Sequence, residues 1–443
     1  MPRLLDEKTK DIQTMKKIIY QIMPRLWGKG VLASCDAATL DYIRSLGVDY
    51  VWFTGLPRHA TGQPFVKGDP GSPYAVTDWL DINPYLAENP SERMAEFSAL
   101  VSCTHDAGLK FLMDYIPNHV ARDYQGSIVH YDYCDGDWTD TLKNNWDDPR
   151  TFDAMLEILR YWASLGVDGF RCDMVELVSS EKLGRLIEAV KTDFPGLVFV
   201  AEVYGKENYR RYLDAGFDLL YDKCGLYDAL DWVCRYGGTA ESLTWNWQFL
   251  GDMQPRMLNF LENHDELRLA SRQFLGSASR AYAALAFSLL FNDAWFMLYA
   301  GQEVGEDASE SGDGRTSIFN WCAPRMLGDL HASLHGEGKL DSCESAVLDR
   351  YRALLELAKL PVFRSGKCWD LCYCNRGSAG FDPQRHFVFL RYDDASAWLV
   401  ACNFSDASAE LTVAFPEELG SVVGDREPVR LSIPSWDAAA VHL

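Results

Sequence analysis

Apolar runs rich in β-branched and aromatic residues alternate with amphipathic stretches between residues 18 and 299. Eight such runs separated by helical patterns predict a parallel α/β sheet. Eight strands also fit closure into a (β/α)8 TIM barrel, although this pattern alone does not separate a closed barrel from a doubly wound open sheet. The expected strands are Ile18–Met23, Tyr50–Thr54, Lys110–Asp114, Val167–Asp173, Leu197–Glu202, Leu219–Tyr221, Met257–Leu261 and Trp295–Tyr299, and the clearest helices are Ala37–Leu46, Glu92–Ala107, Thr151–Leu165 and Ser277–Phe291.

Two stretches interrupt this alternation. Residues 55–90 are rich in glycine, proline and aromatic side chains and predict a long loop, and residues 120–150 predict a short polar insert after the third strand. Long loops at one end of a barrel usually carry function. Beyond Pro361 the apolar positions alternate with period two, which predicts a C-terminal antiparallel β-sandwich domain. We therefore expect a barrel over residues 1–119 and 151–360, an insert over 120–150 and a β domain over 361–443.

Length and charge narrow the class of protein. The 443 residues suit a large barrel with an accessory module, and 48% hydrophobic residues fill a sizeable core. No window approaches a membrane span, and the charged N-terminal sequence lacks the apolar segment of a secretory signal, so we expect a cytoplasmic protein with no membrane partner. A net charge of −22 argues against nucleic acid as a partner. The twelve cysteines are irregularly spaced, with Cys372 and Cys374 on an expected strand, and predict free thiols.

Polar side chains gather where the expected strands end, which is where the reacting groups of barrel enzymes lie. Arg171 and Asp173 are two apart on the fourth strand and therefore face the same side. The guanidinium is expected to lower the pKa of Asp173, whereas like charges raise that of Glu202 on the next strand. An ionised carboxylate opposite a protonated one is the arrangement of glycosidic bond cleavage. The other candidates are Asp114, Asn118 and His119 after the third strand and His264 and Asp265 after the seventh.

These segments resemble the alpha-amylase family of glycoside hydrolases, family 13. DYIPNH, GFRCDMVE, AEVY and FLENHDE match the four main motifs of that family in order, and IIYQIMPRLWG, LGVDYVWFTG, SPYAVTDWLDINP and YAGQEVGE agree with other segments. The resemblance implies Asp173 as nucleophile, Glu202 as acid/base and Asp265 as stabiliser of the transition state. It also implies sugar contacts in the central subsite from Tyr74, His119, Arg171 and His264.

Three departures from the family pattern bear on the expected length of the substrate and on metal binding. Ser72-Pro73-Tyr74 replaces the usual His-Gly-Tyr, and Glu176-Leu177 stands where many alpha-amylases have Lys-His. The insert is also short, so we expect a preference for short chains. Asn118 matches a calcium ligand of the family, but a full set of six or more oxygen ligands is missing from the pattern. We therefore expect no cofactor and no metal, with Asn118 as a weak calcium candidate.

The leading hypothesis is a retaining hydrolase that cleaves α-1,4 or α-1,6 glucosidic bonds of maltooligosaccharides or starch-type glucans by double displacement. A transglycosylase or phosphorylase with the same covalent intermediate is the close alternative. A non-catalytic carbohydrate-binding relative is a third, and the presence of Asp173, Glu202 and Asp265 argues against it. A metal-dependent barrel hydrolase needs clustered histidine ligands, which the two separated histidines do not provide.

Overall fold

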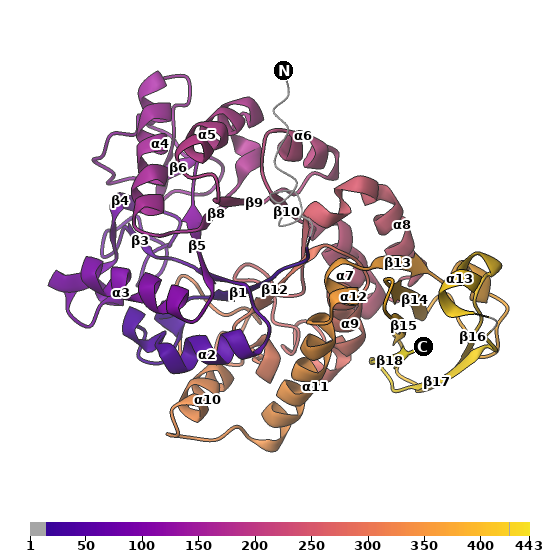
Figure 1. The fold of residues 1–443 in the computed structure, drawn as a ribbon. Helices are drawn as coiled ribbons and strands as arrows, with labels where there is room; N and C mark the ends of the chain where they lie inside the picture. The colour runs from indigo at the N-terminus through magenta and orange to yellow at the C-terminus, as the bar shows by residue number, and fades with distance from the viewer. Residues whose placement is uncertain (1–14, 425) are drawn as a thin grey trace.

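The computed structural model of the chain describes residues 15–424 and 426–443. Eight parallel strands close into a barrel in the order β1-β12-β11-β10-β9-β8-β5-β2. The closed barrel excludes the doubly wound open sheet and confirms the predicted fold class (Figure 1). Its strands are β1 (Ile18–Ile22), β2 (Tyr50–Phe53), β5 (Lys110–Tyr115), β8 (Gly169–Cys172), β9 (Val198–Ala201), β10 (Leu219–Tyr221), β11 (Met257–Phe260) and β12 (Trp295–Tyr299).

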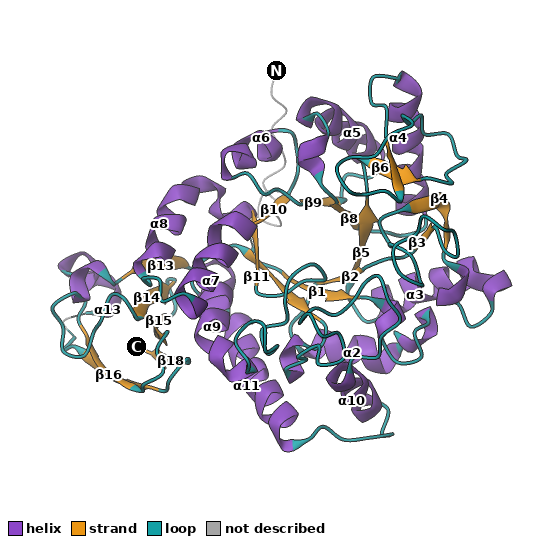
Figure 2. Ribbon diagram, turned by 180° about the vertical axis from the view of Figure 1, so that it is seen from behind, coloured by secondary structure: helices purple, strands orange, loops and turns teal. Residues whose placement is uncertain are grey.

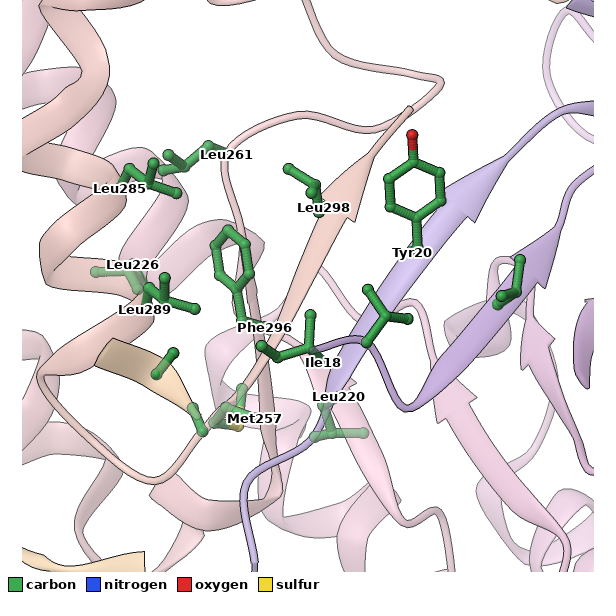
Figure 3. Packing of buried hydrophobic residues seen from close by; sticks show 14 of the residues in the cluster. Ile18, Tyr20, Leu220, Leu226, Met257, Leu261, Leu285, Leu289, Phe296 and Leu298 are labelled. Carbon is green, nitrogen blue, oxygen red and sulfur yellow. The ribbon is translucent and has the colours of Figure 1, made fainter. Parts of the chain in front are cut away.

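Alternation along each strand divides the barrel core into two parts. Ile19 of β1 points inward and joins Trp52, Leu112 and other residues in a cluster inside the barrel. Ile18 points outward, toward the surrounding helices. Figure 3 shows this outer layer, in which Ile18 lies beside Phe296 and faces the helix that carries Leu285 and Leu289. The two buried faces explain why the strands are apolar at nearly every position.

Helices surround the barrel (Figure 2). The expected helices occur within a few residues of their predicted bounds, and several shorter ones were not expected. The α-helices are α2 (Ala37–Ser45), α3 (Arg93–Asp106), α4 (Pro149–Ser164), α5 (Ser180–Asp193), α6 (Tyr209–Asp214), α7 (Asp228–Arg235), α8 (Glu241–Leu250), α9 (Tyr282–Leu290), α10 (Arg325–Leu334), α11 (Ser342–Ala358), α12 (Pro361–Ser365) and α13 (Gly420–Val423). Within the residues that the structure describes, no helix combines the length and the apolar character that a membrane span requires.

The prediction of a long loop after the second barrel strand is partly wrong. It contains an antiparallel pair, β3 (Pro57–His59) and β4 (Val76–Ile82), whose register shifts between successive residue pairs. This irregularity hides the period-two pattern that would have identified the strands. The segment after β5 contains a second short pair, β6 (His119–Ala121) and β7 (Thr141–Lys143). Both pairs lie at the carboxyl end of the barrel strands.

The C-terminal part forms a four-stranded antiparallel sheet and a two-stranded sheet beside the barrel (Figure 1). The larger sheet has the order β13 (Lys367–Asp370), β14 (His386–Tyr392), β15 (Ala397–Asn403) and β18 (Ala438–His442), and the smaller pairs β16 (Ala409–Val413) with β17 (Val429–Ile433). The prediction of a strand around Cys372 and Cys374 is wrong. The side chain of Asp370 accepts from the Cys372 N–H at 2.7 Å, and the chain turns into a short 3-10 helix. The twelve cysteines are free thiols, as expected.

Candidate active site

The expected site residues converge at the carboxyl end of the barrel. Asp173 directly follows β8, Glu202 follows β9, and Asp265 lies beyond β11. These three carboxylates line one cavity of about 300 Å³ together with Tyr74 and His119. The remaining lining residues are Lys67, Ser72, Trp138, Asp140, Thr141, Met174, Tyr204, Ile318 and Phe319. The cavity therefore gathers five of the expected site residues, whereas Arg171 and His264 are not among its lining residues.

Arg171 is the centre of charge below this cavity and is only 1% exposed. Its Nη1 donates to Oδ1 of Asp173 at 2.7 Å, and its Nη2 lies 2.8 Å from Oε1 of Glu202. Asp114 and Asp265 lie farther away, at 3.7 and 4.0 Å from the guanidinium nitrogens. One buried cation thus holds the carboxylates of Asp173 and Glu202 next to each other. The contact with Glu202 was not expected from the sequence.

The pKa values of the two carboxylates correct one expectation. Burial raises the pKa of Glu202 to about 8, against the attraction of Arg171 and with a contribution from the charge of Asp173. Burial also raises the pKa of Asp173, because removal from water outweighs the nearby guanidinium. The predicted lowering for Asp173 is therefore wrong, and the predicted rise for Glu202 has the right direction but burial as its main cause. The Asp114 carboxyl is buried too, and its pKa rises to about 7.

His264 belongs to a hydrogen-bonded layer behind the cavity. The side-chain amide of Gln21 is hydrogen bonded to its Nδ1 at 2.7 Å, and the hydroxyl of Tyr74 is hydrogen bonded to its Nε2. Burial holds the pKa of His264 well below its usual value, so the ring is neutral at pH 7. Because Gln21 donates to Nδ1, Nε2 carries the proton and faces Oδ2 of Asp265 at 3.1 Å. The network fixes the orientation of Asp265.

His119 opens β6 and faces the cavity from the other side. Burial lowers the pKa of its imidazole to about 4, so the ring is neutral at pH 7. Its ring centre lies 5.4 Å from that of Trp138. A neutral imidazole beside an indole offers both a polar atom and an apolar surface, which suits the mixed faces of a sugar.

Asn118, the weak calcium candidate, does not line the cavity. Its Nδ2 donates to Oδ2 of Asp135 at 2.8 Å, and Oδ1 of Asp135 is paired with Lys143 at 2.9 Å. Oδ1 of Asn118 is buried without a hydrogen-bond partner and is one oxygen that a cation would use. Among the residues that the structure describes, no group of three His, Cys, Asp or Glu side chains is placed to hold a metal ion. The donor set therefore does not fit a calcium site with six or more oxygen ligands.

Several site residues were missed in the sequence. The hydroxyl of Tyr204 donates to Oε1 of Glu202 at 2.9 Å. Its spacing of two from Glu202 at a strand end was a signal that both face the same side. Glu176, which stood out only as a departure from the family, accepts from the N–H groups of Tyr204 and Gly205 at 2.8 and 3.1 Å. Lys67 and Asp140 belong to loops, where periodicity gives no information on which side chains face inward.

Comparisons with known proteins bear on the family and the fold. The model of the alpha-amylase catalytic domain matches residues 37–142. Alpha-amylase MalA of Haloarcula japonica is 29% identical over 363 residues, which cover 73% of this chain and 49% of that protein. A 4-alpha-glucanotransferase of Thermotoga maritima is 25% identical over 317 residues, which cover 60% of this chain and 66% of that protein. The crystal structure of an Anoxybacillus alpha-amylase, 18% identical, superimposes with a TM-score of 0.74 over 97% of this chain and 98% of that one.

The closed barrel places the chain among the (β/α)8-barrel proteins, and its sequence is similar to the alpha-amylase family of glycoside hydrolases. The chain spans about half the length of the Haloarcula relative, so this similarity does not carry over the activity of that whole protein.

Proposed function

We propose that the chain is a retaining glycoside hydrolase that cleaves α-1,4 or α-1,6 glucosidic bonds of short maltooligosaccharides. The observation that carries this proposal is the pair Asp173 and Glu202, held on one guanidinium at the wall of a sugar-sized cavity. Retaining enzymes keep their two carboxyl groups about 5 Å apart, whereas inverting enzymes leave about 6.5–9.5 Å for a water molecule. Two carboxylates on adjacent nitrogens of one arginine favour the shorter spacing.

The reaction has two displacement steps. In the first, protonated Glu202 gives its proton to the glycosidic oxygen while a carboxylate oxygen of Asp173 attacks the anomeric carbon, and the bond to the leaving sugar breaks. In the second, Glu202 takes a proton from water as that water attacks the anomeric carbon and releases Asp173. Two inversions retain the α configuration. The pKa of about 8 keeps Glu202 protonated at neutral pH, as a general acid requires.

The nucleophile must be ionised although burial raises its pKa. The proton that the pair shares resides on Glu202, because Arg171 donates directly to Asp173. Asp265, whose side chain is 38% exposed, lies on the open side of the cavity. There its carboxylate stabilises the positive charge that develops on the sugar ring in the transition state.

Two features support short substrates. A cavity of about 300 Å³ is at the small end of ligand sites. Glu176 is held by the backbone of the loop after β9, and Leu177 beside it is apolar, so neither provides the cationic and imidazole contacts of a Lys-His pair. With fewer contacts to distant sugar units, less binding energy is available to raise the rate at which a polymer is cleaved. The cytoplasmic location expected from the sequence suits such substrates, because polymers are cut before import.

Product analysis tests the proposal. The substrates are maltose, maltotriose, maltoheptaose, pullulan, soluble starch and sucrose, each with and without phosphate, and proton NMR follows the first-formed anomer. We expect α-anomeric products and a higher kcat/KM for maltotriose than for starch, with loss of activity in Asp173→Asn and Glu202→Gln. A β-anomer formed first would overturn retention.

A transglycosylase is the second candidate, favoured by the similarity to the Thermotoga glucanotransferase. It would pass the glucosyl group from Asp173 to a sugar hydroxyl instead of water, so products longer than the substrate would form without new reducing ends. Sugar phosphate, formed only when phosphate is present, would identify a phosphorylase. Binding of maltotriose without turnover would identify a non-catalytic carbohydrate-binding relative.

A further inference from the structure

An ion pair that the reaction does not use lines the cavity. Nζ of Lys67 lies 3.6 Å from Oδ1 of Asp140, and both residues line the cavity. Asp140 is 2% exposed. Its second oxygen, Oδ2, is buried and has no hydrogen-bond partner among the described residues. A buried carboxylate oxygen without a donor is costly, so a donor that reaches this carboxylate would stabilise it.

The loop that carries Lys67 is fixed between two other loops. Gly68 adopts a left-handed φ of +68°, and a Cβ at that position would lie 1.6 Å from the carbonyl oxygen of Phe319. Phe65 and Val66 pack against a small buried cluster that includes Ala121 at the end of β6. The segment therefore bridges the loop after β12 and the segment after β5. This contact walls the cavity on the side where Lys67 and Asp140 meet.

We propose that Lys67 and Asp140 bind the distal hydroxyls of a terminal glucosyl unit, so that the protein acts at the free non-reducing end of its substrate. A sugar hydroxyl donates to the carboxylate of Asp140, and the same or a neighbouring hydroxyl accepts from Lys67. This deepens the proposed function and rests on it. The chemistry selects a neutral polyol, because the carboxylates of Asp140, Asp173 and Asp265 line the cavity together and repel phosphate and carboxylate groups.

The barrel strands that precede Glu202, Lys67 and Asp140 show which end of the sugar the ion pair contacts. The general acid must contact the oxygen of the leaving group, and Glu202 lies with Tyr204 after β9. Lys67 and Asp140 come instead from the loops after β2 and β5, which β8 separates from β9 in the barrel. The charge of Asp140 acts on His119, the expected sugar contact. The sugar bonded to Asp173 therefore extends away from the leaving group toward this ion pair.

End-blocked substrates give a direct test. The 4-nitrophenyl maltooligosaccharides are compared with a free terminal glucose and with a 4,6-acetal on that glucose. We expect the wild type to prefer the free end by at least about 100-fold in kcat/KM, because a site built to hydrogen bond a hydroxyl strongly rejects an analogue that lacks it. Similar rates on free and blocked substrates would overturn the inference.

Substitutions assign the effect to the ion pair. Asp140→Asn and Lys67→Met should each lower kcat/KM on the free-ended substrate by about 10- to 100-fold and reduce the discrimination against the blocked one. Asp137→Asn is the matched control, because this exposed residue lies on the same segment and does not line the cavity. If Asp140→Asn does not fold, Lys67→Met decides, because its side chain is 35% exposed.

The outcomes separate this inference from the proposed function. A wild type that cleaves no α-glucoside would refute the proposed function itself. A wild type that cleaves both free and blocked substrates, or variants that discriminate as the wild type does, would leave the hydrolase intact and refute the role of Lys67 and Asp140.

Discussion

The backbone N–H of Met174 donates to Oε2 of Glu202 at 2.8 Å, and Met174 adopts a left-handed conformation with φ of 43° and ψ of 45°. A non-glycine residue in this region costs about 1 kcal/mol and persists only where its surroundings enforce it. Here the turn that directs the Met174 N–H toward Glu202 immediately follows the candidate nucleophile. The strained backbone of Met174, next to the candidate nucleophile, thus also positions the acid/base Glu202.

Substitutions at Met174 should reveal this strain. Met174→Ile adds a β-branched side chain that disfavours positive φ, whereas asparagine tolerates it. We expect Met174→Ile to be less stable than Met174→Asn by about 1–2 kcal/mol in denaturant unfolding. Met155 in the core of α4 is a suitable comparison, since its ordinary helical backbone offers no reason for asparagine to be tolerated. Equal stability of the two Met174 variants would contradict the assignment.

The activity should fall at alkaline pH with the ionisation of Glu202. The general acid acts when protonated, and its pKa of about 8 means that the protonated fraction decreases as the pH rises through 8. The kcat/KM of maltotriose should therefore decline above that pH. Cleavage of an aryl glucoside with a good leaving group needs little proton donation. Its kcat/KM should therefore show little of this decline at alkaline pH. An equal alkaline decline of kcat/KM on both substrates would show that a group other than Glu202 titrates.

The barrel could be predicted from the sequence because its strands are buried on both faces. Ile18 and Ile19 of β1 illustrate this, since one packs outward against helices and the other inward, and an unbroken apolar run results. The strand ends then located Asp173, Glu202 and Asp265. The β3–β4 pair escaped prediction because its register is irregular.

The electrostatics of the site could not be predicted to the same degree. The spacing of Arg171 and Asp173 gave their contact, but the pKa shift of Asp173 depends on burial, which is a property of the closed tertiary structure. The contact between Lys67 and Asp140 likewise joins two loops whose side-chain directions no periodicity determines. Residues placed by the ends of barrel strands were predictable, whereas this contact between two loops was not.

Removal of Arg171 should be strongly destabilising, more so at alkaline pH. Arg171→Met leaves Asp173 and Glu202 buried without their cation, and breaking such a pair costs about 3–5 kcal/mol. Raised pKa values let both carboxyls protonate at low pH, so the loss should be smaller at pH 5 than at pH 8. Unfolding in urea at the two pH values measures this. Arg210→Met, which removes an exposed pair with Asp252, should change the stability little at either pH, because exposed ion pairs contribute little.

Chelation should leave the activity intact. Asp135, the side chain nearest to the weak calcium candidate Asn118, is already bonded to Asn118 and Lys143. We expect activity and thermal midpoint to be unchanged after dialysis against EDTA. Reversible loss of activity that calcium restores would show that Oδ1 of Asn118 contributes to a metal site.

The last prediction concerns Glu176, whose carboxylate accepts from the N–H of Tyr204 at 2.8 Å and from that of Gly205 at 3.1 Å. The Tyr204 hydroxyl in turn donates to Glu202 at 2.9 Å, so Glu176 acts on the acid/base through this loop. Glu176→Lys replaces an acceptor by a donor and leaves the backbone N–H groups of the loop without a partner. We expect kcat to fall by about tenfold, with a smaller change in KM, as Tyr204 loses its position.

The pH profile distinguishes this positioning role from a general loss of stability. A hydrogen bond donated to a carboxylate favours its ionised form, so displacement of Tyr204 should raise the pKa of Glu202. Glu176→Lys and Tyr204→Phe should therefore both move the alkaline limb to higher pH. Glu188→Lys makes the same charge change at an exposed position of α5 and should leave the limb where it is. If Glu176→Lys lowers the thermal midpoint but does not move the limb, Glu176 stabilises the loop without positioning the acid/base.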